Sequence, residues 1–173
     1  MPLAQQQNKN QLRYRRDGML ISCHRKYRFV SCDFMTYTQL TTDWNADPND
    51  PQVELSVCNT SVTLRFYLNN LQFDNFHEGN KAKVIFINCH KYSFNTMNDE
   101  GYYRGQYRYK YTELPWGEFY KLDTKWQTDF PIRHTVLNET PDITKLNHYI
   151  FFLRDNTFEC VAENYQIEFM PTE

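Results

Sequence analysis

Glycine is scarce in this sequence, and none of the 5 glycines among its 173 residues stands in a phosphate-binding pattern. Neither G-x-x-x-x-G-K-[ST] nor G-x-G-x-x-G occurs, and both motifs need glycine so that the backbone can approach a phosphate closely. The G-x-S-x-G turn that presents a nucleophilic serine is missing as well. The common nucleotide-binding loops and the serine hydrolase elbow are therefore excluded.

Long apolar runs are also missing. The longest, Tyr149–Leu153, is far shorter than the roughly 18 apolar residues that a membrane-spanning helix needs. Residues 1–12 are polar and rich in Gln and Asn, without the apolar segment of a secretory signal. We therefore expect a cytoplasmic protein with no membrane contact, in which residues 1–12 are a disordered tail and 13–173 form a single β-rich domain.

Close cysteine pairs are not found either. The five cysteines are odd in number and widely spaced, which does not fit a disulfide framework or a Cys-x₂-Cys zinc motif: Cys23, Cys32, Cys58, Cys89 and Cys160. We expect reduced thiols in the core.

Residues 43–54 carry oxygen ligands at the spacing of a calcium-binding loop, but Pro48 stands where that loop requires glycine. No metal or cofactor is predicted.

The net charge is small but unevenly spread. The chain carries a formal charge of −2; residues 1–30 hold seven Lys/Arg against one Asp (+6), and the rest hold twelve against twenty (−8). Arg13, Arg15 and Arg16 surround Tyr14, which would suit a weak contact with RNA or single-stranded DNA. The acidic remainder of the chain disfavours nucleic acid as the main partner.

Aromatic residues are abundant, at 17% of the chain. Apolar and polar residues also alternate with a period of two along many segments. Both features are typical of half-buried strands. The fold class predicted is all-β, mainly antiparallel, a sandwich or barrel of about eight or more short strands. At most one short helix is expected, opened at residues 141–147 by Thr140-Pro141-Asp142.

The predicted strands are separated by Gly, Pro and Asn/Asp turns, and two pairs of them form hairpins (53–57 with 62–68, and 148–154 with 158–163). The second hairpin is expected to continue through Tyr165, Ile167 and Phe169. The remaining predicted strands are 19–29, 31–40, 83–89, 102–111 and 118–123. In strand 102–111, a tyrosine face (Tyr103, Tyr107, Tyr109, Tyr111) alternates with a basic face (Arg104, Gln106, Arg108, Lys110).

An aromatic-rich β domain offers either a lined cavity or an exposed aromatic patch. We therefore predict a non-enzymatic binding domain that recognises a protein partner or a small apolar ligand. The residues expected to bind are Trp116, Tyr107, Trp126 and Arg104, and the three tryptophans, including Trp44, are expected to gather at one rim. Exposed edge strands would also allow a homodimer to form by strand pairing.

Two alternatives stay open. The first is an enzyme that uses His77 as an acid or base, because His77 lies between Asp74 and Glu78 in a polar loop. The second is the nucleic-acid contact through the basic N-terminal arm. The segregation of tyrosine and basic residues in 102–111 argues against a stacking surface there, since single-strand binders place both kinds on one face.

Overall fold

The structure, a computed structural model, describes residues 35–109 and 114–172, which belong to the compact unit Asp33–Glu173. The predicted tail 1–12, the basic arm and the predicted strand 19–29 lie outside the described residues. Within the described part, no helix is long and apolar enough to cross a membrane.

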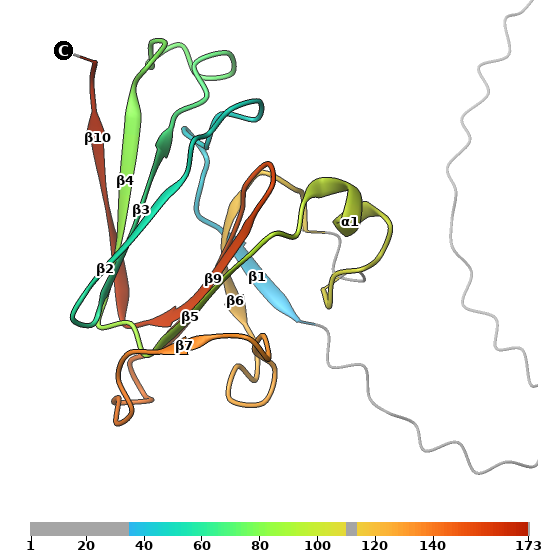
Figure 1. Cartoon of the computed structure of the whole chain (residues 1–173), viewed down its shortest axis with the longest axis vertical. Helices are drawn as coiled ribbons and strands as arrows, with labels where there is room; N and C mark the ends of the chain where they lie inside the picture. Colours follow the sequence, from blue (N-terminus) through green and yellow to red (C-terminus); the bar gives the residue numbers. More distant parts are fainter. Residues whose placement is uncertain (1–34, 110–113, 173) are drawn as a thin grey trace, which may run out of the picture. The chain divides into compact units, whose positions relative to one another are not determined.

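The described strands are all antiparallel and form two sheets (Figure 1), so the predicted all-β, antiparallel fold is confirmed. The six-stranded sheet has the order β1 (Thr36–Gln39), β6 (Phe119–Asp123), β8 (Asn147–Phe152), β9 (Thr157–Ala162), β5 (Lys91–Asn95), β7 (Thr135–Val136). The four-stranded sheet has the order β10 (Asn164–Met170), β4 (Lys81–Ile87), β3 (Ser61–Tyr67), β2 (Glu54–Cys58).

Aromatic side chains between the two sheets form the main core. Alternate residues of β3 and β4 point inward, and their rings meet rings of the other sheet. Phe86 of β4 lies 4.9 Å from Phe158 of β9, and Phe66 of β3 lies 5.2 Å from Phe151 of β8, measured between ring centroids. Two sheets packed face to face make a sandwich rather than a closed barrel.

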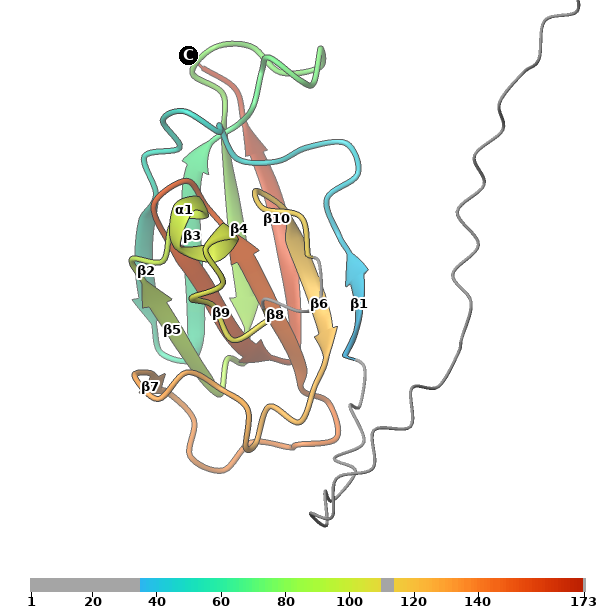
Figure 2. The same ribbon diagram turned by 90° about the vertical axis from the view of Figure 1, so that its right-hand side faces the viewer.

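The central strands of the six-stranded sheet are buried on their second face as well. Residues 96–109 and 114–118, with the short helix α1 (Asp99–Tyr103), cover this outer face (Figure 2). The outer cluster consists of buried residues on both sides of the contact: Tyr102, Tyr107, Tyr109, Leu114, Tyr120, Leu122, Ile150 and Phe152. Strands β8 and β9 therefore have almost no exposed residue, which explains their nearly continuous apolar sequence.

Helix α1 replaces the first part of a predicted strand, so the prediction for 102–111 is wrong over its described residues. The Asn98 side chain accepts a hydrogen bond from the Gly101 N–H at 3.0 Å and caps the helix start. At the other end Gly105 has φ +74°, a left-handed conformation that favours glycine, and the N–H groups of Gly105 and Gln106 close the helix. The tyrosines consequently do not share a face: Tyr103 is 72% exposed, whereas Tyr107 and Tyr109 are buried.

Two further predictions differ from the structure. No helix forms at 141–147, because the Asp142 side chain accepts hydrogen bonds from the backbone and hydroxyl of Thr144, a local turn that competes with helix. Strand β10 does not extend the β8–β9 hairpin. After Glu163, whose N–H donates to Ile87 O at 3.1 Å, the chain leaves the six-stranded sheet and pairs with β4.

Both predicted hairpins are present. Strands β2 and β3 pair around a two-residue turn in which Asn59 has φ +53°, a conformation that asparagine tolerates. Strands β8 and β9 pair from Asn147↔Ala162 to Phe152↔Thr157. The predicted strand 83–89 corresponds to β4, which lies inside its sheet. Among the described cysteines, Cys89 and Cys160 are buried, but Cys58 is exposed, so the expectation of core thiols is wrong for Cys58.

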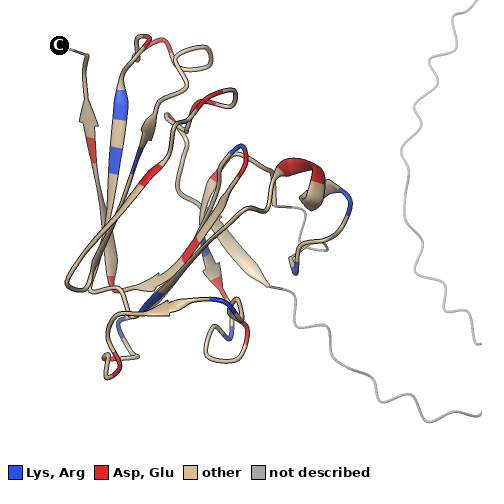
Figure 3. Ribbon diagram, viewed as in Figure 1, with Lys and Arg blue, Asp and Glu red and all other residues tan. Residues whose placement is uncertain are grey.

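The outer face of the four-stranded sheet carries a row of charges (Figure 3). Glu54, Arg65, Lys83 and Glu168 are cross-strand neighbours on β2, β3, β4 and β10. Arg65 lies 3.7 Å from Glu54 and Lys83 lies 3.1 Å from Glu168, measured from nitrogen to oxygen. This face is polar and exposed, and it contrasts with the covered outer face of the other sheet.

Candidate functional site

A carboxylate lies buried on the covered face of the six-stranded sheet. Glu159 of β9 is 0% exposed, and a charge in such a place is costly unless it is paired and hydrogen-bonded. Three side chains supply partners. The Tyr107 hydroxyl donates to Glu159 Oε2 at 3.0 Å, the Arg108 guanidinium donates to Oε1, and His148 Nε2 lies 2.6 Å from the same oxygen.

The position of Glu159 determines which nitrogen of His148 carries hydrogen. Arg108 forms an ion pair with Glu159 through the same oxygen, and a carboxylate in an ion pair only accepts hydrogen bonds, so we assign His148 Nε2 as the donor to it. Burial, followed by the positive charges of Arg108 and Lys91, lowers the pKa of His148 from 6.5 to about 3. The ring is therefore neutral near pH 7, and its bare Nδ1 accepts a hydrogen bond from the Thr124 hydroxyl.

Arg108 and Lys91 attach the loop after β6 to the sheet. Arg108 Nε lies 3.4 Å from Asp129 Oδ1, so one guanidinium joins this loop to the buried Glu159. Lys91 of β5 is 7% exposed; its ammonium donates to Trp126 O at 3.3 Å and lies 4.5 Å above the Phe130 ring. Burial lowers the pKa of Lys91. These contacts hold residues 124–130 against β5 and β8.

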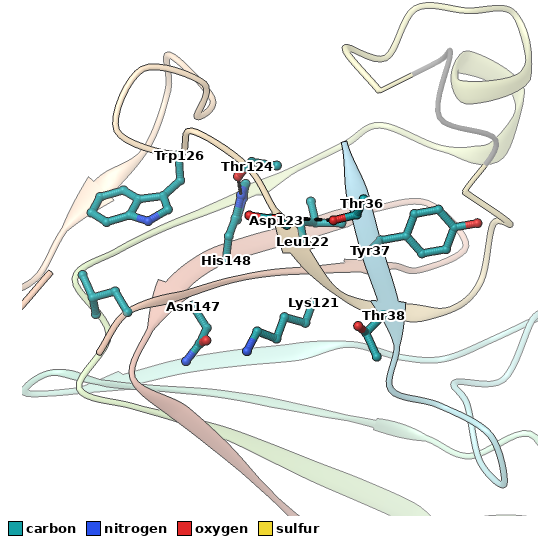
Figure 4. A pocket seen from close by; sticks show the side chains of 11 residues that line it. Thr36, Tyr37, Thr38, Lys121, Leu122, Asp123, Thr124, Trp126, Asn147 and His148 are labelled. Carbon is teal, nitrogen blue, oxygen red and sulfur yellow. Dashed lines mark hydrogen bonds between the residues drawn. The ribbon is translucent and has the colours of Figure 1, made fainter. Parts of the chain in front are cut away.

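A cavity of about 460 Å³ opens beside this network (Figure 4), within the size range of small-molecule sites. Strands β1, β6 and β8 and the residues that flank them line it: Thr36, Tyr37, Thr38, Lys121, Leu122, Asp123, Thr124, Trp126, Leu146, Asn147 and His148. Most of these side chains are polar. Figure 4 shows Thr124 beside the His148 ring, with Trp126 on one side and β1 on the other.

Several polar groups of the cavity already have partners in the protein. The Thr36 hydroxyl donates to Asp123 Oδ2 at 3.2 Å, which joins β1 to β6. Asn147 Nδ2 donates to Lys145 O at 3.2 Å and to Glu163 O at 2.8 Å. Leu122, Trp126 and His148 are buried, whereas the residues that β1 contributes to the cavity are exposed.

The structure places the four predicted binding residues in three locations. Trp126 is 8% exposed and lines the cavity. Trp116 and Tyr107 both contact Phe152 in the outer cluster, at 4.8 Å and 5.7 Å between ring centroids. Arg104 lies at the end of α1, exposed, with its guanidinium 3.6 Å from Glu100. Whether any of the four binds a partner stays a prediction.

The expected gathering of the three tryptophans at one rim is wrong. Trp44 packs between the two sheets, 6.1 Å from Phe66, whereas Trp116 packs on the opposite face of the six-stranded sheet. Trp126 belongs to neither cluster and lies at the cavity. A position near a loop in the sequence does not tell which face of a sheet an indole will cover.

The alternative site at His77 is an exposed turn. The His77 N–H donates to Asn80 Oδ1 at 2.9 Å, and the Asn80 N–H donates to His77 O at 3.0 Å, so the backbone makes these contacts. Among residues 35–109 and 114–172, no group of three or more His, Cys, Asp or Glu is placed to hold a metal ion.

Sequence reasoning missed Glu159, His148 and Thr124. One signal was present: Glu159 stands between Phe158 and Cys160 in a strand that is apolar on both sides, and a charged residue there must be buried and paired. The partner could not be found in the same way, because His148 and Glu159 meet only when β8 and β9 pair.

No protein-family model, no curated protein and no solved structure matches this chain.

Proposed function

We propose that this β-sandwich is a non-enzymatic binding domain, and that a small polar ligand occupies the cavity between β1, β6 and β8. The observation that carries the proposal is the cavity of about 460 Å³ with a polar, prearranged wall. Ligand sites are concave, largely preformed and supplied with a few precisely placed polar groups. The network behind the wall supports such a role, because Glu159 and His148 hold Thr124 in one orientation.

The electrostatics of His148 favour binding over acid–base chemistry. A Glu159–His148–Thr124 chain has the residue types of a nucleophilic triad, in which the histidine takes the hydroxyl proton. A general base works best when its pKa is near the working pH. Burial and the cations Arg108 and Lys91 lower the pKa of His148, which makes it a poorer base, so we assign it the role of orienting Thr124 rather than activating it.

The polar lining favours a polar ligand over the apolar ligand expected from the aromatic content. Thr36, Thr38, Lys121, Asp123 and Asn147 would lose hydration against an apolar molecule without gaining hydrogen bonds. A protein partner, the enzyme based on His77 and the nucleic-acid contact of the basic arm remain predictions from the sequence. We also carry forward a cytoplasmic location, which rests on the sequence alone.

A screen of small polar and apolar compounds by NMR tests the proposal. Trp126 is the reporter, because its indole lines the cavity, whereas Trp44 and Trp116 pack elsewhere and serve as internal references. Substitution of each tryptophan by phenylalanine assigns its indole N–H signal. We expect at least one polar compound to shift the Trp126 signal saturably and to leave the two reference signals in place.

Two variants on β1 show whether the compound occupies the cavity. Thr38→Trp places a large side chain on the lining, and Gln39→Trp places the same side chain on a neighbouring exposed position outside it. We expect binding to be lost in Thr38→Trp and kept in Gln39→Trp. The proposal fails if no compound shifts Trp126, or if Thr38→Trp binds as the unmodified protein does.

A further inference from the structure

We propose that a hard metal cation, Ca²⁺ in preference to Mg²⁺, binds just before β6, where the carboxylate of Glu118 meets the side-chain amides of Asn45 and Gln72. This site is separate from the cavity, to which β6 contributes residues from Lys121 onward. Carboxylate, amide and water oxygens are the ligands that this class of ion prefers. The observation that carries the proposal is the buried amide of Asn45.

The Asn45 amide is poorly satisfied by the protein. The residue is 7% exposed, and its Oδ1 is a buried atom that accepts no hydrogen bond from the described residues. Its Nδ2 faces two acceptors, Glu118 Oε1 at 3.4 Å and Gln72 Oε1 at 3.5 Å. Both distances exceed the usual range of about 2.7–3.2 Å. Buried polar groups are almost always hydrogen-bonded, so an unpaired one can mark the place of a bound ion or water.

The spacing around this amide fits a calcium ion. A half-turn about the Cβ–Cγ bond of Asn45 brings Oδ1 to the position of Nδ2, about 3.4 Å from Glu118 Oε1 and 3.5 Å from Gln72 Oε1. These oxygens have no hydrogen to share, so a cation is needed to join them. Two oxygens at a right angle around one ion lie about 3.4 Å apart for Ca²⁺ and about 2.9 Å apart for Mg²⁺.

Neighbouring hydrogen bonds hold the three ligands in position. The Asn69 N–H donates to Asn45 O at 3.1 Å, and the Asn69 side chain bonds both the N–H and Oε1 of Gln72 at 3.2 Å. The Thr41 hydroxyl donates to Glu118 Oε2, which leaves Oε1 turned to the amides. Thr41, Asn45 and Asn69 are buried, whereas Gln72 is exposed. An ion can therefore enter from the Gln72 side and keep water there as a further ligand.

The site differs from the calcium-binding loop whose spacing residues 43–54 share. Asp47 Oδ1 accepts the N–H groups of Asn49 and Asp50 at 2.7 and 2.9 Å, so it serves a local turn. Asn45 belongs to that segment, but its two co-ligands come from distant parts of the chain. A site with one carboxylate should bind weakly, with a dissociation constant of roughly 10⁻⁴–10⁻³ M.

Titration of the full chain with CaCl₂ tests the inference. The side-chain amide signals of Asn45 and Gln72 are followed by NMR, and substitution of each residue by alanine assigns its signal. MgCl₂ and NaCl at equal ionic strength are titrated in parallel. We expect CaCl₂ to shift both amide signals saturably, MgCl₂ to need a higher concentration, and NaCl to leave them in place.

Two variants should change the affinity in opposite directions. Glu118→Gln removes the charge and keeps the shape, and we expect saturable binding to be lost. Asn45→Asp adds a second carboxylate beside Glu118. It should bind Ca²⁺ about tenfold more tightly, because affinity rises with ligand charge, and be less stable than the unmodified protein without Ca²⁺, because like charges repel. A gain of affinity cannot arise from a failure to fold.

Matched controls make the same chemical changes on β10. Glu168→Gln and Asn164→Asp alter exposed positions on the outer face of the four-stranded sheet. Both should bind Ca²⁺ as the unmodified protein does.

Three outcomes would overturn the inference. If CaCl₂ leaves the Asn45 and Gln72 signals in place, or acts no more strongly than NaCl, these residues hold no metal ion. If MgCl₂ acts at the same concentration as CaCl₂, the choice of Ca²⁺ is wrong. If Asn45→Asp binds Ca²⁺ no more tightly than Asn164→Asp does, Asn45 is not a ligand.

Discussion

His148 and Glu159 are diagonal neighbours on β8 and β9: His148 pairs with Val161 and Glu159 pairs with Ile150, yet His148 Nε2 lies 2.6 Å from Glu159 Oε1. Both side chains are almost completely buried under the covering segment, residues 96–109 and 114–118. The pair connects the cavity wall, through Thr124, with the covering segment, through Tyr107 and Arg108. Substitutions of His148 or Glu159 should therefore affect both the free energy of unfolding and the cavity wall.

Glu159→Gln should destabilise the domain strongly. The amide has only one acceptor oxygen, so Arg108, His148 and Tyr107 would compete for it, and the partly exposed guanidinium would keep only Asp129 as its counter-charge. Leaving a buried hydrogen-bonding group without its partner typically costs about 1–3 kcal/mol. Urea denaturation followed by circular dichroism measures the loss.

Glu168→Gln is the matched control for Glu159→Gln, because it removes one exposed carboxylate that pairs with Lys83 at 3.1 Å. Exposed pairs contribute about 0–1 kcal/mol, so the midpoint of unfolding should hardly move. Equal losses in the two variants would contradict a structural role for the buried network.

Acid should weaken the fold through His148. Its pKa is about 3 in the folded protein and near 6.5 when unfolded, so between these values the unfolded chain binds one proton that the folded chain does not. Stability then rises with pH across this window, by at most about 1.4 kcal/mol per unit, and this contribution is complete above about pH 6.5.

His148→Gln isolates this effect from other titrating groups. Between about pH 5 and pH 7 most carboxylates stay ionised, so the unfolding free energy of the unmodified protein should fall towards the acid side. The variant should be less stable overall but should show a clearly smaller slope in this window. An unchanged slope would mean that the pH dependence comes from other groups.

Phe152→Ala should loosen the covering segment. Phe152 is fully buried and contacts the rings of Tyr102, Tyr107, Trp116 and Tyr120. Truncating such a residue costs about 3–5 kcal/mol. Limited proteolysis with identification of the fragments should find faster cleavage within residues 96–109 or 114–118 than in the unmodified protein.

Phe94→Ala serves as the control for Phe152→Ala, because Phe94 is 37% exposed at the end of β5. Cleavage within 96–109 and 114–118 should stay at the rate of the unmodified protein. If both variants, or neither, accelerate cleavage there, the outer cluster does not hold the covering segment in place.

Thiol reactivity should separate the described cysteines. Cys58 is exposed at the end of β2, whereas Cys89 and Cys160 are buried in the core. Burial also raises the pKa of the Cys160 thiol, which lowers its thiolate fraction. Brief alkylation of the folded protein with peptide mapping should find Cys58 modified and the other two protected; rapid modification of Cys160 would contradict this packing.

Local patterns were sufficient for much of the secondary structure. Alternation predicted β3, a continuous apolar run predicted β4, and asparagine at the turn predicted the β2–β3 hairpin, because these signals depend on residues close in sequence. Two local predictions failed. At 99–105 capping by Asn98 and Gly105 outweighed alternation, and at 142–144 a side-chain turn outweighed a helix start.

The sequence by itself determined the all-β class, the short antiparallel strands and the abundance of aromatic core residues, since each follows from composition and period-two patterning. Only the tertiary structure decided which strands share a sheet, as when Glu163 turns the chain from β9 into the other sheet. It also decided that Thr124, His148, Glu159 and Arg108 meet. These residues come from four separate segments, and their contacts arise because strand pairing and burial force polar side chains to find partners across the fold.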